Sequence, residues 1–142
     1  MFSELRRRLC CGSASLISCA GKLQQRLIMG SFQSSTVPPV EAVKAVDEAI
    51  TSHSLTVFSK TTCPYCVRAK QLLREVGAKP FVMELDTRSD GYVIQDELQR
   101  RTGSRSVPKV FVREKCIGGC DDTVSLHRQG RLVSMLKEAG AL

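Results

Sequence analysis

Cys63-Pro64-Tyr65-Cys66 holds two thiols two residues apart, at a point where the sequence changes from strand-like to helical. Just before it, Leu55-Thr56-Val57-Phe58 is a short apolar and β-branched run, which predicts a buried strand. Pro64 suits the first position of a helix, because its ring presets a helical φ and its missing N–H would have no partner there. The pattern therefore predicts a strand-to-helix turn with Cys63 at the helix N-cap.

The position of Cys63 favours a reactive thiolate. An N-cap side chain faces unpaired backbone N–H groups and the positive end of the helix dipole, and Lys60 and Arg68 lie close in sequence. Cys66 lies one turn further along, where this field is weaker. It is therefore better placed to attack a disulfide made by Cys63 than to start the reaction, and the spacing favours a redox-active pair.

Two other interpretations of these cysteines are open. They could form half of a zinc site with Cys116 and Cys120, although the 49 residues between Cys66 and Cys116 exceed the usual spacing in compact zinc modules. They could also be inert, since free cysteine often packs as a small buried hydrophobe. Redox chemistry is the favoured interpretation of the three.

Length and composition indicate one folded domain with a tail. The chain has 142 residues, enough for one sizeable core. It has seven cysteines but only one pair at close redox spacing, which favours a reducing compartment over a secreted disulfide scaffold. No stretch approaches the ~20 apolar residues of a membrane span. With two tyrosines, no tryptophan and no basic run interleaved with aromatics, nucleic-acid binding is not expected.

Residues 1–37 are expected to be a basic leader and residues 38–142 the folded domain. The first 35 residues hold five basic side chains and one acidic one, out of a formal net charge of +7. Their leucines are spaced for an amphipathic helix with a basic face, as in a mitochondrial transit peptide, and a plain disordered tail is the alternative. We therefore expect a mitochondrial location, with a cytoplasmic form if translation starts at Met29.

The first half of the domain is predicted to be helix, strand, helix, strand. Residues 40–52 have the spacing of an amphipathic helix, with His53 at its C-terminal end. The strand at residues 55–58, the helix begun by Pro64 and a strand near residues 81–85 form a βαβ unit, so the two strands should be parallel. The positions expected to face the core are Val40, Val43, Val46, Ile50, Ala69, Leu72, Leu73, Val76, Phe81, Met83 and Leu85.

The second half is predicted to hold three helices and a hairpin. Asp90 can cap a helix, and residues 107–112 are predicted as a strand that pairs with residues 116–117. Asp121 or Asp122 can cap the helix that follows. The positions expected to face inward are Tyr92, Ile94 and Leu98, and in the last helix Leu132, Met135, Leu136 and Ala139.

Three motifs in register make the sequence resemble a dithiol glutaredoxin. They are Phe58-Ser59-Lys60-Thr61-Thr62-Cys63-Pro64-Tyr65-Cys66, Thr102-Gly103-Ser104-Arg105-Ser106-Val107-Pro108 and Cys116-Ile117-Gly118-Gly119-Cys120-Asp121-Asp122. The likeness implies an α/β protein of the thioredoxin fold, with a four-stranded mixed sheet flanked by helices and a cis bond before Pro108. The basic leader resembles that of the second, organellar glutaredoxin of vertebrates, whereas Cys116 and Cys120 resemble the cytosolic first type.

The resemblance also implies a glutathione site around Cys63. Lys60 and Gln95 would hold the glycyl carboxylate, Tyr65 would flank the sulfur, and Val107 would pair its backbone with the cysteinyl part. At the γ-glutamyl end, backbone N–H groups at a helix start would bind the carboxylate and acidic side chains would lie near the ammonium. The residues implied for that end and for the loop are Arg105, Pro108, Cys120, Asp121 and Asp122. Taken without the resemblance, Lys60 would be a solvated charge, Gln95 a surface residue and Asp121 a cap.

Two positions depart from the family pattern. Ser106 stands where threonine is usual, and Asp121 where serine or threonine is common. Neither change removes a backbone contact, so we expect an effect on affinity more than on activity.

The implied activity is glutathione-dependent thiol–disulfide exchange. Cys63 would reduce protein–glutathione mixed disulfides alone, and Cys66 would act as resolving thiol for protein disulfides. Glutathione would be the co-substrate, glutathionylated or disulfide-bonded proteins the partners, and the protein a monomer without a metal. The alternative is a dimeric sensor or carrier with a glutathione-ligated [2Fe–2S] cluster on Cys63 of each chain. Pro64 argues against this, because related cluster-binding members tend to carry a smaller or more flexible residue there.

Overall fold

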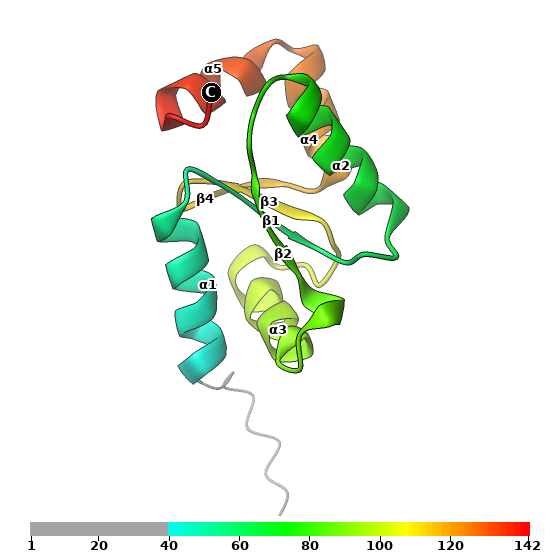
Figure 1. Ribbon diagram of the computed structural model, residues 1–142, viewed down its shortest axis with the longest axis vertical. Helices are drawn as coiled ribbons and strands as arrows, with labels where there is room; N and C mark the ends of the chain where they lie inside the picture. The colour runs from blue at the N-terminus through cyan, green and yellow to red at the C-terminus, as the bar shows by residue number, and fades with distance from the viewer. Residues whose placement is uncertain (1–39) are drawn as a thin grey trace, which may run out of the picture. The chain divides into compact units, whose positions relative to one another are not determined.

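The computed structural model describes residues 40–142 (Figure 1). The predicted leader and the alternative start at Met29 lie outside the described residues. Within the described part, no helix has both the length and the apolar character needed to cross a membrane.

A four-stranded mixed sheet forms the centre of the domain. Its order is β2-β1-β3-β4, where β1 and β2 are parallel and the other neighbours are antiparallel. The sheet confirms the predicted βαβ unit and the predicted hairpin. The strands are β1 (Leu55–Ser59), β2 (Phe81–Glu84), β3 (Lys109–Val112) and β4 (Lys115–Gly118).

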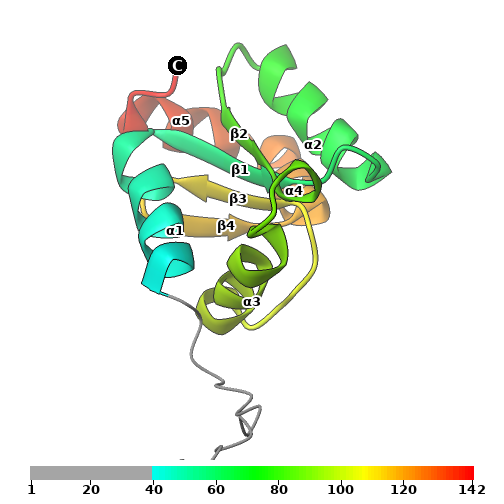
Figure 2. The ribbon, with the colours of Figure 1, turned by 60° about the horizontal axis from the view of Figure 1, so that its bottom comes forward.

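Helices cover both faces of the sheet, which makes three layers (Figures 1 and 2). On one face lie α1 and α3; on the other lie α2, α4 and α5. A short 3₁₀ turn, η1 (Leu85–Thr87), follows β2. The helices are α1 (Val40–Ser52), α2 (Pro64–Glu75), α3 (Gly91–Thr102), α4 (Cys120–Arg128) and α5 (Arg131–Ala139).

Successive side chains of β1 and β3 point to opposite faces of the sheet, which divides the core into two hydrophobic clusters. Phe58 and Phe111 point toward α1 and α3, where their rings meet edge to face with centroids 5.6 Å apart. Val57 and Val110 point to the opposite face, where they pack with the helices on that side. Both central strands are therefore buried on both faces, as their apolar sequence predicts.

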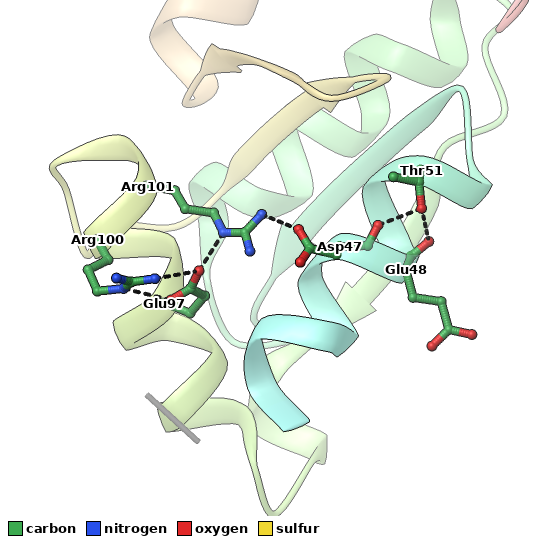
Figure 3. Close-up of polar contacts among 6 residues, drawn as sticks. All are labelled: Asp47, Glu48, Thr51, Glu97, Arg100 and Arg101. Carbon is green, nitrogen blue, oxygen red and sulfur yellow. Dashed lines mark hydrogen bonds and ion pairs between the residues drawn. The ribbon is translucent and has the colours of Figure 1, made fainter. Parts of the chain in front are cut away.

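Charged side chains link α1 to α3 on the first face (Figure 3). Glu97 on α3 is fully buried and accepts hydrogen bonds from Arg100 and Arg101. Arg101 also donates to Asp47 on α1, at 2.6 Å. We call these four side chains the α1–α3 ion cluster, in which Arg101 is the bridge between the helices.

Several predicted details are wrong. Tyr92 is 67% exposed instead of inward-facing, and Val40 is exposed at the first position of α1. Leu85 is buried but belongs to η1, because β2 ends at Glu84. Asp90 is the N-cap residue of α3, but its carboxylate pairs with Arg88 and makes no capping hydrogen bond.

Candidate active site

The turn between β1 and α2 carries the two thiols. Cys63 is the N-cap residue of α2, with extended backbone angles (φ −90°, ψ 115°), and Pro64 occupies the first helical position, as predicted. The Cys63 N–H donates to the Lys60 carbonyl at 3.2 Å, which closes the turn. The Cys63 carbonyl in turn accepts the N–H groups of Cys66 and Val67, both at 3.1 Å. The start of the helix thus fixes the backbone at Cys63.

The two sulfurs lie in different environments. Cys63 is half-buried, whereas Cys66 is fully buried. The Cys66 backbone N–H donates to the Cys63 sulfur at 3.4 Å, so this sulfur lies against the first turn of α2. Burial, and next the hydrogen bond with Cys63, raises the pKa of Cys66 to about 11. Cys66 is therefore a protonated thiol at neutral pH, which suits the resolving role predicted for it.

The loop before β3 forms a second wall of the site. The Val107–Pro108 bond is cis, as the resemblance implied. The Val107 carbonyl accepts a hydrogen bond from the Cys63 thiol, with sulfur and oxygen 3.8 Å apart. Pro108 is buried behind it. The structure therefore brings Val107 to Cys63 although the two are far apart in sequence.

The same loop is held by α3 through residues predicted to contact glutathione. The Gln95 side-chain amide donates to the Arg105 carbonyl at 2.6 Å, and Gln95 is buried. The Arg105 guanidinium forms an ion pair with Asp96, one residue further along α3. In this structure both predicted residues thus brace the loop.

The first turn of α4 forms the third part of the site. The Asp122 carboxylate accepts the Gly119 N–H at 2.9 Å, so Asp122 is the capping residue of the two candidates. Gly118 has a φ of 110°, and a Cβ there would lie 2.2 Å from the Asp122 carboxylate oxygen. A side chain at this position would therefore displace the cap. Asp121 is exposed beside it in the first turn.

Cys120 connects α4 to the thiol pair. It is buried at the first helical position, and burial raises the pKa of its thiol. The charge of Arg68 opposes this rise in pKa, and the charge of Asp121 adds to it. Of the remaining predicted residues, Tyr65 is 58% exposed next to Cys63, and Lys60 is half-buried in the turn.

Cys116 and Cys120 lie on opposite sides of the sheet. Cys116 on β4 packs against the cluster under α1 and α3. Cys120 belongs to α4, which lies on the opposite face with α2 and α5. Ile117, the residue after Cys116 in β4, also points to that opposite face and packs against the hydrophobic cluster there. Both cysteines are free thiols. The zinc interpretation finds no support in this arrangement, and residues 40–142 contain no group of three or more side chains placed to ligate a metal.

Asp86, which contacts the turn that carries the thiols, was not predicted from the sequence. Its carboxylate accepts hydrogen bonds from the Thr61 N–H, at 2.8 Å, and from the Thr61 hydroxyl. A signal was present: Asp86 follows β2 and Thr61 follows β1, and the carboxyl ends of parallel strands meet at one edge of a sheet.

Comparison with known proteins relates this architecture to one family. The glutaredoxin family model matches residues 55–117. Glutaredoxin-C2 of Arabidopsis thaliana is 54% identical over 101 residues, which cover 71% of this chain and 91% of the relative. A glutaredoxin of Ricinus communis is 52% identical over 101 residues, which cover 71% of this chain and 99% of the relative. The structure also resembles the crystal structure of a buckwheat glutaredoxin–glutathione complex, with a TM-score of 0.71 and 47% sequence identity. The match covers 72% of this chain and 93% of the buckwheat chain.

The thioredoxin fold and the N-capping thiol above a buried second thiol define a thiol–disulfide oxidoreductase. Sequence identities near 50% over most of the relatives' length show which family of these oxidoreductases the chain belongs to. The chain belongs to the glutaredoxin family and is a glutathione-dependent enzyme, with glutathione as its co-substrate. The expected likeness to the vertebrate second glutaredoxin is not supported, because the relatives from Arabidopsis thaliana and Ricinus communis are plant proteins.

Proposed function

We propose that this glutaredoxin is of the dithiol type and works by two routes that share Cys63. In the first, the Cys63 thiolate attacks the glutathione sulfur of a protein–glutathione mixed disulfide. The disulfide bond breaks, and the protein thiolate leaves and takes up a proton from water. A second glutathione thiolate then attacks the adduct, releasing oxidised glutathione and restoring Cys63.

In the second route, Cys63 attacks a protein disulfide and becomes joined to one of its sulfurs. Cys66 loses its proton and attacks Cys63, which releases the reduced protein and leaves an internal Cys63–Cys66 disulfide. Two glutathione molecules then reduce this disulfide and are themselves oxidised. The observation that carries both routes is the contrast between the half-buried N-cap thiol and the fully buried thiol behind it.

We further propose that glutathione binds along the three segments that meet at Cys63. Support comes from the Val107 carbonyl, which lies against Cys63, and from Gly119 at the start of α4, which lies beside the Pro108 carbonyl. Val107 would then pair with the cysteinyl part of the tripeptide, and the first N–H groups of α4 would take its γ-glutamyl carboxylate. The buckwheat relative is described as a complex with glutathione, which agrees with such a site. The cluster-bound dimer stays a prediction.

The location of the protein is also a proposal. We infer that residues 1–37 act as a mitochondrial transit peptide and that a start at Met29 gives a cytoplasmic form. The basic, acid-poor composition of this leader supports the first part. Cysteines at residues 10, 11 and 19 would be removed with it.

Two cysteine variants test the two routes. Cys63→Ser should abolish reduction of both a glutathionylated peptide and a peptide disulfide, because it removes the shared nucleophile. Cys66→Ser should keep reduction of the glutathionylated peptide and lose reduction of the peptide disulfide. Rates are measured with glutathione and a coupled assay for oxidised glutathione. Activity of Cys63→Ser on either substrate would contradict the mechanism.

A further inference from the structure

Asp86 ties the active-site turn to the end of the neighbouring strand. One oxygen of its carboxylate accepts both the Thr61 N–H and the Thr61 hydroxyl. Thr61 follows Lys60 directly and precedes Cys63 by two residues. The hydroxyl of Thr61, with smaller contributions from the N–H groups of Thr61 and Thr62, holds the pKa of Asp86 below its usual value. Asp86 is therefore an ionised acceptor at neutral pH.

The strand register makes this contact a property of the fold. Ser59 at the end of β1 lies opposite Glu84 at the end of β2. Thr61 and Asp86 each follow two residues beyond that pair, so the turn after β1 and the 3₁₀ turn η1 leave the sheet side by side. The short turn η1 then carries the carboxylate to the backbone of the neighbouring loop.

The Asp86 contact holds the Thr61 side of this turn from outside, whereas the Cys63 side contacts the Val107 carbonyl. The Cys63 N–H donates to the Lys60 carbonyl inside the turn. That bond sets the local shape but does not fix the turn relative to the sheet. Thr61 and Thr62 are exposed, so without the carboxylate the Thr61 N–H would be paired with water and the turn could move away from β2.

We propose that Asp86 is a positioning residue of the active site. It fixes the Lys60–Cys63 turn, so that the Lys60 ammonium and the Cys63 sulfur keep the spacing needed to bind a glutathione disulfide. Asp86 itself takes no part in bond exchange. The inference rests on the glutathione site proposed above, in which Lys60 would hold the glycyl carboxylate, as the resemblance implies. Since a looser turn must be ordered when substrate binds, the loss should fall mainly on KM.

The test compares variants of the full chain with the mixed disulfide of glutathione and 2-mercaptoethanol as substrate. Asp86→Ala should raise KM about three- to tenfold, the range expected for loss of a modest hydrogen bond, with kcat within about twofold of the parent. Asp86→Asn should stay close to the parent, because its amide oxygen can accept the same two hydrogen bonds. Asp90→Ala is the matched control: Asp90 lies on the same connection but pairs with Arg88, so KM should not change.

Three outcomes would overturn the proposal. They are a KM for Asp86→Ala equal to that of Asp90→Ala, a loss confined to kcat, and an Asp86→Asn variant as impaired as Asp86→Ala. If Asp86→Ala fails to fold, Thr61→Val takes its place, because it removes only the hydroxyl and should raise KM by a smaller factor; an unchanged KM for Thr61→Val then overturns the proposal. Cys63→Ser in the same assay separates this result from the proposed chemistry, since its activity would refute the mechanism whatever Asp86 does.

Discussion

The chemistry of the site depends on a difference between two identical side chains. Cys63 occupies the N-cap, where it is half-buried and its sulfur accepts the backbone N–H of Cys66. Cys66 lies one turn further along α2, without solvent contact. The first thiol can meet a bulky substrate, and the second can meet only what is already attached to the first. Attack on glutathione mixed disulfides therefore needs one cysteine, and resolution of a protein disulfide needs both.

This difference predicts a pH dependence for the dithiol route. Burial is the largest cause that raises the pKa of Cys66 to about 11, and it persists when Cys63 is in a mixed disulfide. Only the thiolate of Cys66 attacks, and below its pKa the thiolate fraction grows about tenfold for each pH unit. Starting from a glutathione adduct on Cys63, the first-order release of glutathione by Cys66 should therefore rise about tenfold per unit between pH 7 and pH 9. Acid quenching and mass spectrometry of the protein measure it.

The Cys66→Ser adduct is the control for this experiment, and it should keep its glutathione over the same pH range. A rate that levels off near pH 7 in the parent protein would contradict the prediction. It would mean that Cys66 ionises far more easily than its burial implies.

Residue roles were predictable where local sequence determines them. The N-cap position of Cys63 followed from Pro64, which can begin a helix but not continue one. The exposure of Tyr92 and the contact of Asp86 with the turn did not follow, because both depend on which element packs alongside. Gln95 was predicted from the resemblance to bind glutathione, and its hydrogen bond to the loop carbonyl became visible only in the structure.

At the scale of elements, α1 and α3 are joined by charge as well as by apolar packing. Arg101 lies between the buried Glu97 of its own helix and Asp47 of α1 (Figure 3). Arg100 contacts Glu97 alone and is 58% exposed. Both arginines neutralise the same carboxylate, but only Arg101 connects two helices. The two side chains thus offer a matched comparison of a bridging and a non-bridging ion pair.

Arg101→Ala should destabilise the protein more than Arg100→Ala does. The loss for Arg101→Ala should be about 1–2 kcal/mol at neutral pH, because it breaks two charged hydrogen bonds and leaves Glu97 with one partner. Urea unfolding followed by circular dichroism measures it. Equal losses for the two variants would show that the bridge to α1 contributes nothing.

The same ion cluster has a predictable response to acid. Burial opposes ionisation of Glu97, but hydrogen bonds from Arg100 and Arg101 outweigh it and hold its pKa below the usual value. The hydrogen bond from Arg101 likewise lowers the pKa of Asp47. A carboxyl whose pKa is lower in the folded state adds stability above its unfolded pKa of about 4, and this is lost as pH falls through the folded value. The difference between the parent and Arg101→Ala should therefore shrink below about pH 4.

Elements were predictable from periodicity, and their edges were not. The alternation of Phe81, Met83 and Leu85 correctly indicated a strand, but β2 is an edge strand that ends at Glu84. Phe81 is partly exposed there, with the His53 ring stacked on it at a centroid distance of 3.9 Å. An apolar alternation predicts which face of a strand is buried, but it cannot indicate whether the strand lies at the edge of its sheet.

At the scale of the whole molecule, residues 40–142 pack around one sheet. Both hydrophobic clusters, the four-stranded sheet and the three segments around Cys63 are formed by residues of this range. The sequence predicts a domain boundary at residue 38, because core periodicity starts near residue 40 and the basic, acid-poor composition stops before it. We therefore expect the folded domain to determine stability and catalysis, and the leader to determine the compartment to which the protein is targeted.

A chain of residues 38–142 should therefore have the same kcat/KM for a glutathionylated peptide and the same urea midpoint as the full chain. A truncated enzyme of lower activity would show that the leader contributes to the site.

Residues 1–37 fused to a fluorescent protein should direct it to mitochondria, because a basic amphipathic helix is the feature that import requires. The control fusion replaces Arg6, Arg7 and Arg8 with glutamine, which keeps length but removes the basic cluster, and it should stay in the cytoplasm. Mitochondrial import of the control fusion would show that the basic cluster is not the signal.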